Sequence, residues 1–254
     1  MWSQGDYPAV AKLLEPCAIK LADACNLRAG MTVLDVAAGT GNFALAASER
    51  GADVTACDLT SRMIDLGRER SHAAGHDIEW READAEALPF PDANFDVVAS
   101  VFGAMFAPRP ERVSSELFRV CRDDGLVAMA NYSWDGFLGE MSKLFARYSN
   151  RLPLDLPSPF EWGDPEVVSD RFAGLAKGVD VEESVLTMSF ESVGAGFEFW
   201  ERTNAPTIAL RATSTPERYV EFQRDARGLM EELNESGSGR LELSSSYITV
   251  LARK

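Results

Sequence analysis

A glycine-rich turn between a short apolar run and a helical pattern is the feature of this sequence with the clearest chemical use. Residues 33–45 read VLDVAAGTGNFAL, with Gly39 and Gly41 at the turn. Glycines let the backbone turn sharply and let a ligand approach with no Cβ in the way. The helix that follows begins with unpaired N–H groups. The segment fits the loose dinucleotide pattern G-x-G-x-x-G/A, so a nucleotide site and a plain strand-to-helix turn both stay open here.

Three carboxylates stand at the ends of three successive predicted strands. Asp58 follows Gly39 by 19 residues, where a carboxylate can accept both ribose hydroxyls of an adenosine or, alternatively, cap the next helix. Asp84, followed by Ala85, can accept from an adenine amino group, although a polar surface loop gives the same pattern. Asp35 places a negative charge at the mouth of the glycine turn, which favours a cationic group and repels a pyrophosphate.

The elements that must position these residues alternate between strands and helices. Apolar runs predict strands at residues 31–37, 52–58, 77–83, 94–102 and 125–132. Helical spacing predicts helices at residues 8–26, 41–50, 61–73 and 108–122, the last opened by Pro108 or Pro110. This alternation implies right-handed βαβ units and a parallel sheet.

After Tyr132 the pattern is less regular. An amphipathic stretch covers residues 135–150, and the segment 151–165 contains Pro153, Pro157, Pro159 and Pro165, which predict a loop or lid. The remaining elements are predicted as strands at 179–190 and 244–254 and helices at 194–203 and 215–234.

Composition excludes several classes of protein. The chain has 254 residues and a formal net charge of −15, so anionic partners such as nucleic acids and membrane surfaces are disfavoured. Its 46% hydrophobic content is that of a globular protein. The four scattered cysteines predict reduced, buried thiols in a cytoplasmic protein and no metal site. No signal peptide or membrane-spanning run is predicted, and no phosphate-binding G-x-x-x-x-G-K-[ST] loop occurs.

Four segments together closely resemble the class I S-adenosylmethionine-dependent methyltransferases, in the type 11 or ubiquinone/menaquinone methyltransferase-like group. They are VLDVAAGTGN, VTACD, EADAEALPFPDANFDVV and ELFRVCRDDGLVAMANY. The resemblance is strong over residues 30–132 and weaker in the N-terminal WSQGDY and the C-terminal half. The family pattern at the turn is D-x-G-x-G-x-G, and Ala37 stands where its first glycine is usual.

The resemblance implies an α/β fold, a Rossmann-like doubly wound, mostly parallel sheet of seven strands. Its expected order is 3-2-1-4-5-7-6 with the last strand antiparallel, with helices on both faces and a lid insert after strand five. One methyltransferase domain is expected over residues 1–254. Its expected parts are an N-terminal helix and lid (1–29), a cofactor-binding core (30–132), a lid insert (133–179) and a C-terminal completion of the sheet with helices (180–254).

The implied cofactor is S-adenosylmethionine, which leaves as S-adenosylhomocysteine. Asp35 would orient the methionine ammonium, Asp58 would hold the ribose, and Asp84 with Ala85 would read adenine. The other residues expected to bind the cofactor form its backbone cradle, pack on adenosine, flank the methionine and sulfonium, or cover the site as an N-terminal lid. They are Ala37, Gly39 and Gly41; Leu59 and Met63; Ser100, Val101 and Phe102; and Gly5 and Tyr7.

Two other functions stay open at this point. An NAD(P)-dependent oxidoreductase has nearly the same glycine pattern, but the charge of Asp35 and the absence of any Tyr-x-x-x-Lys dyad disfavour it. A non-catalytic module that binds S-adenosylmethionine is the second alternative.

Aromatic residues predict an apolar substrate chamber above the carboxyl ends of the strands. We therefore expect a small aromatic or lipophilic methyl acceptor, with oxygen, nitrogen and carbon all open as the acceptor atom, and a monomer or homodimer. The chamber residues expected are Met105, Phe106, Trp134, Phe137, Phe160 and Trp162. No catalytic residue is identified, and the polar candidates to test are Asn131, Tyr132 and Glu161.

Overall fold

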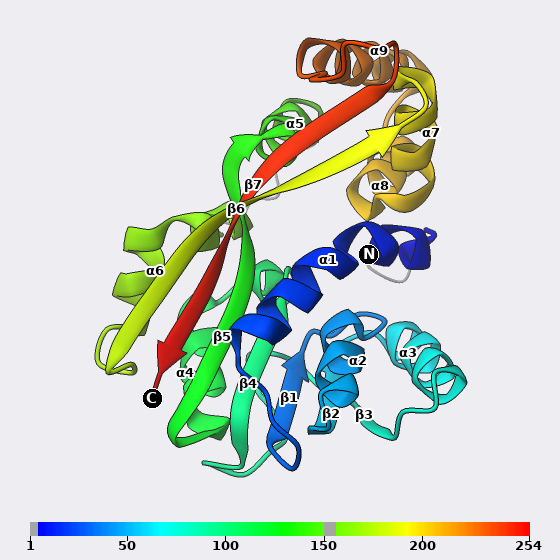
Figure 1. Ribbon diagram of the computed structural model, residues 1–254. Coiled ribbons are helices and arrows are strands. Elements are labelled where there is room, and N and C mark those ends of the chain that lie inside the picture. The colour runs from blue at the N-terminus through cyan, green and yellow to red at the C-terminus, as the bar shows by residue number, and fades with distance from the viewer. Residues whose placement is uncertain (1–4, 150–155) are drawn as a thin grey trace. The chain divides into compact units, whose positions relative to one another are not determined.

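The computed structural model describes residues 5–149 and 156–254 (Figure 1). Pro153, part of the predicted loop or lid, lies outside the described residues. The chain divides into two compact units. The first, here called the core unit, comprises Leu14–Tyr132, Leu156–Ser184 and Tyr247–Lys254, and the second unit comprises Met1–Leu13, Ser133–Asp155 and Val185–Ser246. The predicted single domain and its lid insert stay predictions.

A seven-stranded sheet of order β3-β2-β1-β4-β5-β7-β6 organises the chain. Its strands are β1 Thr32–Val36, β2 Asp53–Asp58, β3 Ile78–Glu82, β4 Phe95–Val101, β5 Cys121–Gly136, β6 Gly178–Phe190 and β7 Leu241–Arg253. The first five pair in parallel. The end of β7 meets the beginning of β5, where the Lys254 N–H donates to the Gly125 carbonyl at 3.1 Å, so β7 is antiparallel. The predicted fold and strand order are confirmed.

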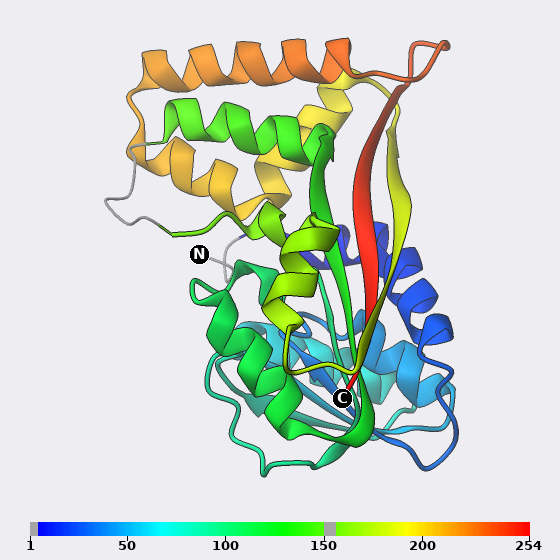
Figure 2. The ribbon, with the colours of Figure 1, turned by 90° about the vertical axis from the view of Figure 1, so that its left-hand side faces the viewer.

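Helices cover both faces of the sheet in the core unit (Figure 2). On one face, buried residues of α1 (Tyr7–Ala24), α2 (Asn42–Glu49) and α3 (Ser61–Ala73) join Val33, Val54 and Val97 in a single apolar cluster. On the other face lie α4 (Pro110–Val120) and α6 (Pro165–Phe172), which meet where Phe118 contacts Phe172 edge to face at 5.0 Å. With both faces covered, the central strands β1 and β4 are mostly buried and largely apolar, as expected of parallel strands.

The second unit contains α5 (Phe137–Tyr148), α7 (Val193–Thr203), α8 (Ala205–Thr213) and α9 (Pro216–Glu232). Phe222 of α9 is its central side chain, in contact with Phe145 at 5.0 Å and with Tyr148 at 5.5 Å between ring centres. The Tyr148 hydroxyl donates to the Asp225 carboxylate at 2.6 Å. These aromatic contacts hold α5 against α9.

Some predicted boundaries were wrong. The helix predicted to Arg122 ends at Val120, and β5 begins at Cys121 instead of Gly125 and extends to Gly136. The cause is long-range pairing, because Cys121 pairs with Phe95 beside a bulge in β4. Helices α6 and α8 were not predicted; Asp164 and Asn204 cap them by accepting N–H groups of their first turns. A short 3-10 helix, η2 (Pro159–Gly163), also interrupts the predicted proline-rich loop.

Two further expectations concern cysteines and membranes. All four cysteines are buried and free, as predicted. No helix within residues 5–149 and 156–254 is long and apolar enough to span a bilayer. Over the same residues, no cluster of three His, Cys, Asp or Glu side chains has the arrangement of a metal site.

Candidate functional site

Asp35 is a buried carboxylate at the carboxyl end of β1. Its side chain is 1% exposed, and its Oδ2 accepts the N–H of Ala44 in the first turn of α2 at 2.9 Å. Burial raises the pKa of Asp35 to about 8; the nearby charge of Asp58 adds to the rise, and the Ala44 hydrogen bond opposes it. Among the described residues, no cation offsets this charge. The carboxylate is thus poised for a cationic ligand.

The turn after β1 uses three residues in the left-handed region of backbone space. The φ angles are 54° at Ala37, 57° at Gly39 and 82° at Gly41. A side chain costs roughly 1–2 kcal/mol in this conformation, so Ala37 is strained where a glycine would not be. Gly41 has a second reason to lack a side chain, because a Cβ there would lie 2.7 Å from the Trp80 ring. Packing on β3, and not only ligand approach, therefore requires this glycine.

Asp58 joins the glycine turn to the beginning of α3. Its Oδ2 accepts the Gly39 N–H at 2.9 Å, and its Oδ1 accepts the Thr60 N–H at 2.9 Å. Burial is the main cause that raises the pKa of this half-buried carboxyl. Thr60, not Asp58, occupies the N-cap position of α3. An ionised carboxylate accepts hydrogen bonds at both of its oxygens, which is the chemistry that ribose hydroxyls need.

Asp84 and Ala85 follow β3 directly beside Asp58. The Ala83 N–H donates to the Asp58 carbonyl at 3.0 Å, which continues the pairing of β2 with β3 past Glu82. The Asp84 Oδ1 accepts the Glu86 N–H at 2.9 Å, and Ala85 is 9% exposed. The structure therefore brings Asp35, Asp58 and Asp84 to the ends of adjacent strands β1, β2 and β3.

The end of β4 completes this edge of the sheet. Ser100 donates to the Val36 carbonyl at 2.7 Å and accepts the Ala104 N–H at 3.0 Å, so its hydroxyl ties the turns after β1 and β4 together. Phe102 has a φ of 54°, a strained conformation for an aromatic residue. Its ring stacks on Tyr132 at 3.9 Å with 3° between the ring planes. Such strain persists where surrounding contacts hold it, frequently at functional sites.

Gly103 and Trp80 were not predicted as part of the site. A Cβ on Gly103 would lie 2.3 Å from the Ala37 carbonyl oxygen, so only glycine fits between the turns after β1 and β4. A glycine directly after a strand was the only sequence signal for it. Trp80 packs against both Gly41 and Gly67, and its indole donates to Ser71 at 3.3 Å. No sequence pattern indicated this contact between distant residues.

The remaining predicted cofactor residues are divided between the two units. Leu59 is 65% exposed after β2, Met63 is buried in α3, and Val101 ends β4. Gly5 and Tyr7 belong to the second unit, where a Cβ on Gly5 would lie 3.0 Å from the carbonyl oxygens of Arg202 and Thr203.

The predicted chamber residues are likewise divided. Met105 and Phe106 lie in a 3-10 turn, η1 (Ala104–Phe106), and Phe160 and Trp162 lie in η2, all in the core unit. Trp162 is 1% exposed beneath the Arg171 guanidinium. Trp134 and Phe137 belong to the second unit, where Phe137 contacts Trp200 edge to face at 5.2 Å.

The three polar candidates differ in their contacts. Glu161 accepts the Ser158 N–H at 3.2 Å and pairs with Arg171 at 2.9 Å, which favours a structural role. Tyr132 stacks on Phe102. Asn131 is 1% exposed, and neither its Oδ1 nor its Nδ2 has a hydrogen-bond partner among the described residues. A buried amide without partners costs about 1–3 kcal/mol, so Asn131 is the candidate with unused polar capacity.

Comparison with known proteins gives the family. A family described as methyltransferase domain matches residues 34–129. An uncharacterized protein of Mycobacterium tuberculosis is 41% identical over 189 residues, covering 74% of this chain and 69% of that protein. The ubiquinone/menaquinone biosynthesis C-methyltransferase UbiE of Yersinia enterocolitica is 31% identical, covering 69% and 70%. A phosphatidylethanolamine N-methyltransferase of Cereibacter sphaeroides is 37% identical, covering 59% and 75%.

Solved structures share the fold. The YcgJ protein from Bacillus subtilis has a TM-score of 0.64 at 18% identity, covering 94% of this chain and 98% of that one. A geranyl diphosphate C-methyltransferase from Streptomyces coelicolor, in complex with S-adenosyl-L-homocysteine, has a TM-score of 0.54 at 16% identity, covering 95% and 81%.

The strand order and the acidic, glycine-rich edge of the sheet define a Rossmann-like methyltransferase fold. The chain belongs to the class I S-adenosylmethionine-dependent methyltransferases. It is an enzyme, and its cofactor is S-adenosylmethionine. The predicted family, activity and cofactor are confirmed, and the NAD(P)-dependent oxidoreductase and the non-catalytic module are set aside.

Proposed function

We propose that this enzyme transfers the methyl group to a small aromatic or lipophilic molecule. The observations that carry the proposal are two: Phe102 stacks on Tyr132, and the preceding residue of β5, Asn131, has a buried amide without partners among the described residues. Binding sites for such molecules combine apolar walls with a few placed polar groups. Relatives named for phosphatidylethanolamine and for ubiquinone/menaquinone biosynthesis agree with a lipophilic acceptor.

The cofactor would be held at the acidic edge formed by β1, β2 and β3. The buried Asp35 carboxylate would bind the methionine ammonium, and the lack of a described counter-cation there supports this role. Asp58 would accept the ribose hydroxyls, and Asp84 with Ala85 would contact adenine. The other predicted cofactor residues keep the roles given above, including Gly5 and Tyr7 as a lid.

S-adenosylmethionine, when bound, supplies a methyl group on a positively charged sulfur that is a good leaving group. The residues of this chain would then hold the acceptor in line with that methyl group, because placement within about 3–3.5 Å is the main catalytic requirement. The Asn131 amide would orient a polar group of the acceptor, and Tyr132 with Phe102 would exclude water. Transfer would bond the methyl carbon to the acceptor atom as its bond to sulfur breaks, a proton displaced from the acceptor would pass to solvent, and S-adenosylhomocysteine would leave.

The location, partners and oligomeric state of the enzyme are part of the same proposal. The net charge of −15 supports a small-molecule partner and neither nucleic acid nor membrane as partner. The four buried, free cysteines support a cytoplasmic enzyme. Monomer and homodimer are both compatible with this function.

A product screen tests the proposal. Purified protein is incubated with a metabolite library and S-adenosylmethionine labelled in its methyl group, and labelled products are identified by mass spectrometry. The expected product is an aromatic or lipophilic molecule heavier by one labelled methyl group, and Asp58→Ala should reduce its formation. Label appearing only in small polar metabolites of the library would contradict the proposed acceptor class.

A further inference from the structure

The loop between β3 and β4 carries the proposed adenine contacts but little regular structure of its own. Residues 83–94 contain a tight turn in which Glu86 and Ala87 donate their N–H groups to Asp84, at 2.9 and 3.0 Å. Connecting loops of this kind are as a rule the more mobile parts of a fold. What fixes this loop therefore fixes the position of Asp84 and Ala85.

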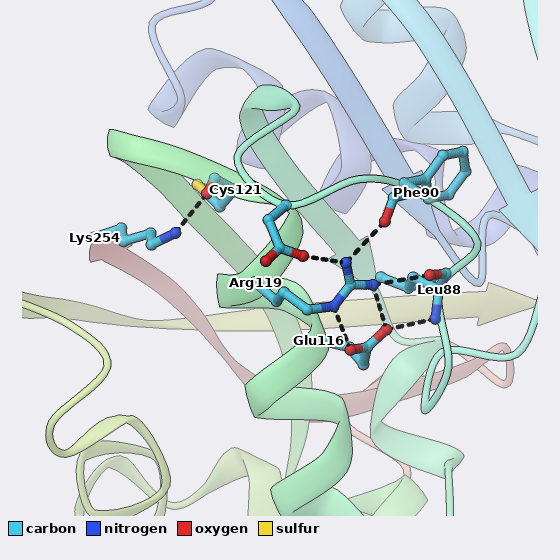
Figure 3. Close-up of polar contacts among 7 residues, drawn as sticks. Leu88, Phe90, Glu116, Arg119, Cys121 and Lys254 are labelled. Carbon is cyan, nitrogen blue, oxygen red and sulfur yellow. Dashed lines mark hydrogen bonds and ion pairs between the residues drawn. The ribbon is translucent and has the colours of Figure 1, made fainter.

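Two side chains of α4 bind the backbone of this loop (Figure 3). Arg119 donates to the carbonyl oxygens of Leu88 and Phe90, both at 2.8 Å. Glu116 accepts the Leu88 N–H at 2.6 Å. Leu88 thus has both its backbone polar groups bound by one pair of side chains, here called the α4 clamp.

The two members of the α4 clamp also bind each other. Arg119 Nε donates to Glu116 Oε1 at 2.6 Å, and Nη2 donates to Oε2 at 2.8 Å, a two-point ion pair one helical turn apart. Arg119 further pairs with Asp92 at 2.8 Å. The guanidinium lowers the pKa of Glu116, so the pair is charged at neutral pH. The planar guanidinium provides these bonds from fixed directions, which a lysine cannot reproduce.

Further contacts anchor the two ends of the loop to the same helix. At the end nearest Asp84, the buried Glu86 carboxylate accepts the Arg109 N–H at 2.7 Å and pairs with the Arg109 guanidinium. At the other end, the N–H groups of Ala93 and Asn94 donate to the last carbonyls of α4 at 2.9 and 2.8 Å. In the middle of the loop, the α4 clamp binds the backbone of Leu88 and Phe90, and the Phe90 ring also contacts Phe95 edge to face at 5.2 Å.

We propose that Arg119 and Glu116 are positioning residues for adenine recognition, acting through the loop that carries Asp84 and Ala85. This inference rests on the proposed adenine role of those two residues. In this proposal neither Arg119 nor Glu116 contacts the cofactor. Loosening the clamp leaves ribose and methionine contacts in place and removes the fixed geometry by which the adenine amino group is distinguished from a carbonyl group at the same ring position.

The test compares two ligands and two arginine variants. Dissociation constants are measured by calorimetry for S-adenosylhomocysteine and for S-inosylhomocysteine, which carries oxygen in place of the adenine amino group. Arg119→Met removes the clamp. Arg122→Met is the matched control, since Arg122 pairs at 2.6 Å with Asp96, which lies outside the loop of residues 83–94. Glu116→Gln is the second variant should Arg119→Met fail to fold, and all proteins are compared at a temperature where circular dichroism shows them native.

The wild type should prefer S-adenosylhomocysteine by about tenfold or more, since a site that hydrogen-bonds an amino group rejects the analogue without it. Arg119→Met and Glu116→Gln should bring this preference to roughly threefold or less, whereas Arg122→Met keeps it. A clamp variant that stays folded and keeps the wild-type preference would overturn the inference. A wild type that binds both ligands equally would instead overturn the adenine role of Asp84 and Ala85, and the inference with it.

Discussion

The carboxylate of Asp58 accepts the N–H of Gly39 at 2.9 Å, so the end of β2 holds the glycine turn that follows β1. One side chain therefore stabilises the turn and, in the proposed site, accepts the ribose. Asp58→Ala should weaken S-adenosylhomocysteine binding by about 1–3 kcal/mol, because a charged acceptor is lost. Calorimetry measures this, with Asp65→Ala on the exposed part of α3 as the control. Unchanged affinity in Asp58→Ala would remove Asp58 from the site.

Asp35 predicts a proton release on cofactor binding. Its pKa of about 8 means that the free enzyme holds this proton at pH 6.5, whereas an ammonium group requires the carboxylate. Binding of S-adenosylhomocysteine at pH 6.5 should therefore release about one proton, and the affinity should rise as the pH approaches 8. Calorimetry in two buffers of different ionisation enthalpy measures the release.

A proton released on binding comes from Asp35 and not from the ligand, because the ligand's own amino group can only take up a proton on becoming an ammonium. Asp84→Asn should show the wild-type release. No release, or net uptake, in the wild type would contradict the ammonium role of Asp35.

The free enzyme itself should lose stability as pH rises from about 4 to about 8, since the folded state holds the Asp35 proton more tightly than the unfolded state. Asp35→Asn should flatten this part of the pH profile.

Replacing Asn131 by an apolar residue should raise the stability of the enzyme and lower its activity. Asn131→Leu replaces a buried amide that has no partner among the described residues by an apolar side chain, and should raise the free energy of unfolding by roughly 1–3 kcal/mol while lowering methyl transfer. The matched control is Thr249→Val, which removes a buried hydroxyl that also lacks a partner among the described residues and should stabilise without loss of activity. Denaturant unfolding and product formation are the two readouts. A stabilised Asn131→Leu enzyme with full activity would exclude Asn131 from the acceptor site.

Gly103 should tolerate no side chain. Gly103→Ala places a Cβ 2.3 Å from the Ala37 carbonyl oxygen, and should destabilise by about 1–3 kcal/mol and weaken cofactor binding. Gly228→Ala in α9 is the control, because a Cβ there meets nothing within 4 Å. That control should stabilise by roughly 0.5–1 kcal/mol, as alanine suits a helix better than glycine. Equal stability of the two variants, measured by denaturant unfolding, would contradict the close contact between the two turns.

The sequence was sufficient to predict the alternation of strands and helices and the carboxylates at the ends of the strands. Asp35, Asp58 and Asp84 could be placed together because parallel strands bring their carboxyl ends to one edge of the sheet. The strand order followed from the resemblance of the segments that contain these residues. Helices α6 and α8 were missed although the sequence contains a signal for each, since Asp164 precedes Pro165 and Asn204 lies two residues before Pro206.

Contacts between residues far apart in the chain could not be predicted from the sequence. Nothing local shows that Trp80 fills the space beside Gly41, or that Gly103 must fit against Ala37. The α4 clamp likewise joins Arg119 to Leu88, 31 residues apart. The boundary between α4 and β5 was misplaced for the same reason, because the pairing of Cys121 with Phe95 decides it.

The most direct test of the central claim, that the edge containing Asp35, Gly39 and Asp58 binds S-adenosylmethionine, is thermal unfolding with S-adenosylhomocysteine or NADH. At about 100 times its dissociation constant, S-adenosylhomocysteine should stabilise the wild type by about 2.7 kcal/mol, and at the same concentration it should stabilise Asp58→Ala far less. NADH should have no effect on either. Stabilisation by NADH alone, or equal stabilisation of wild type and Asp58→Ala by S-adenosylhomocysteine, would contradict the account.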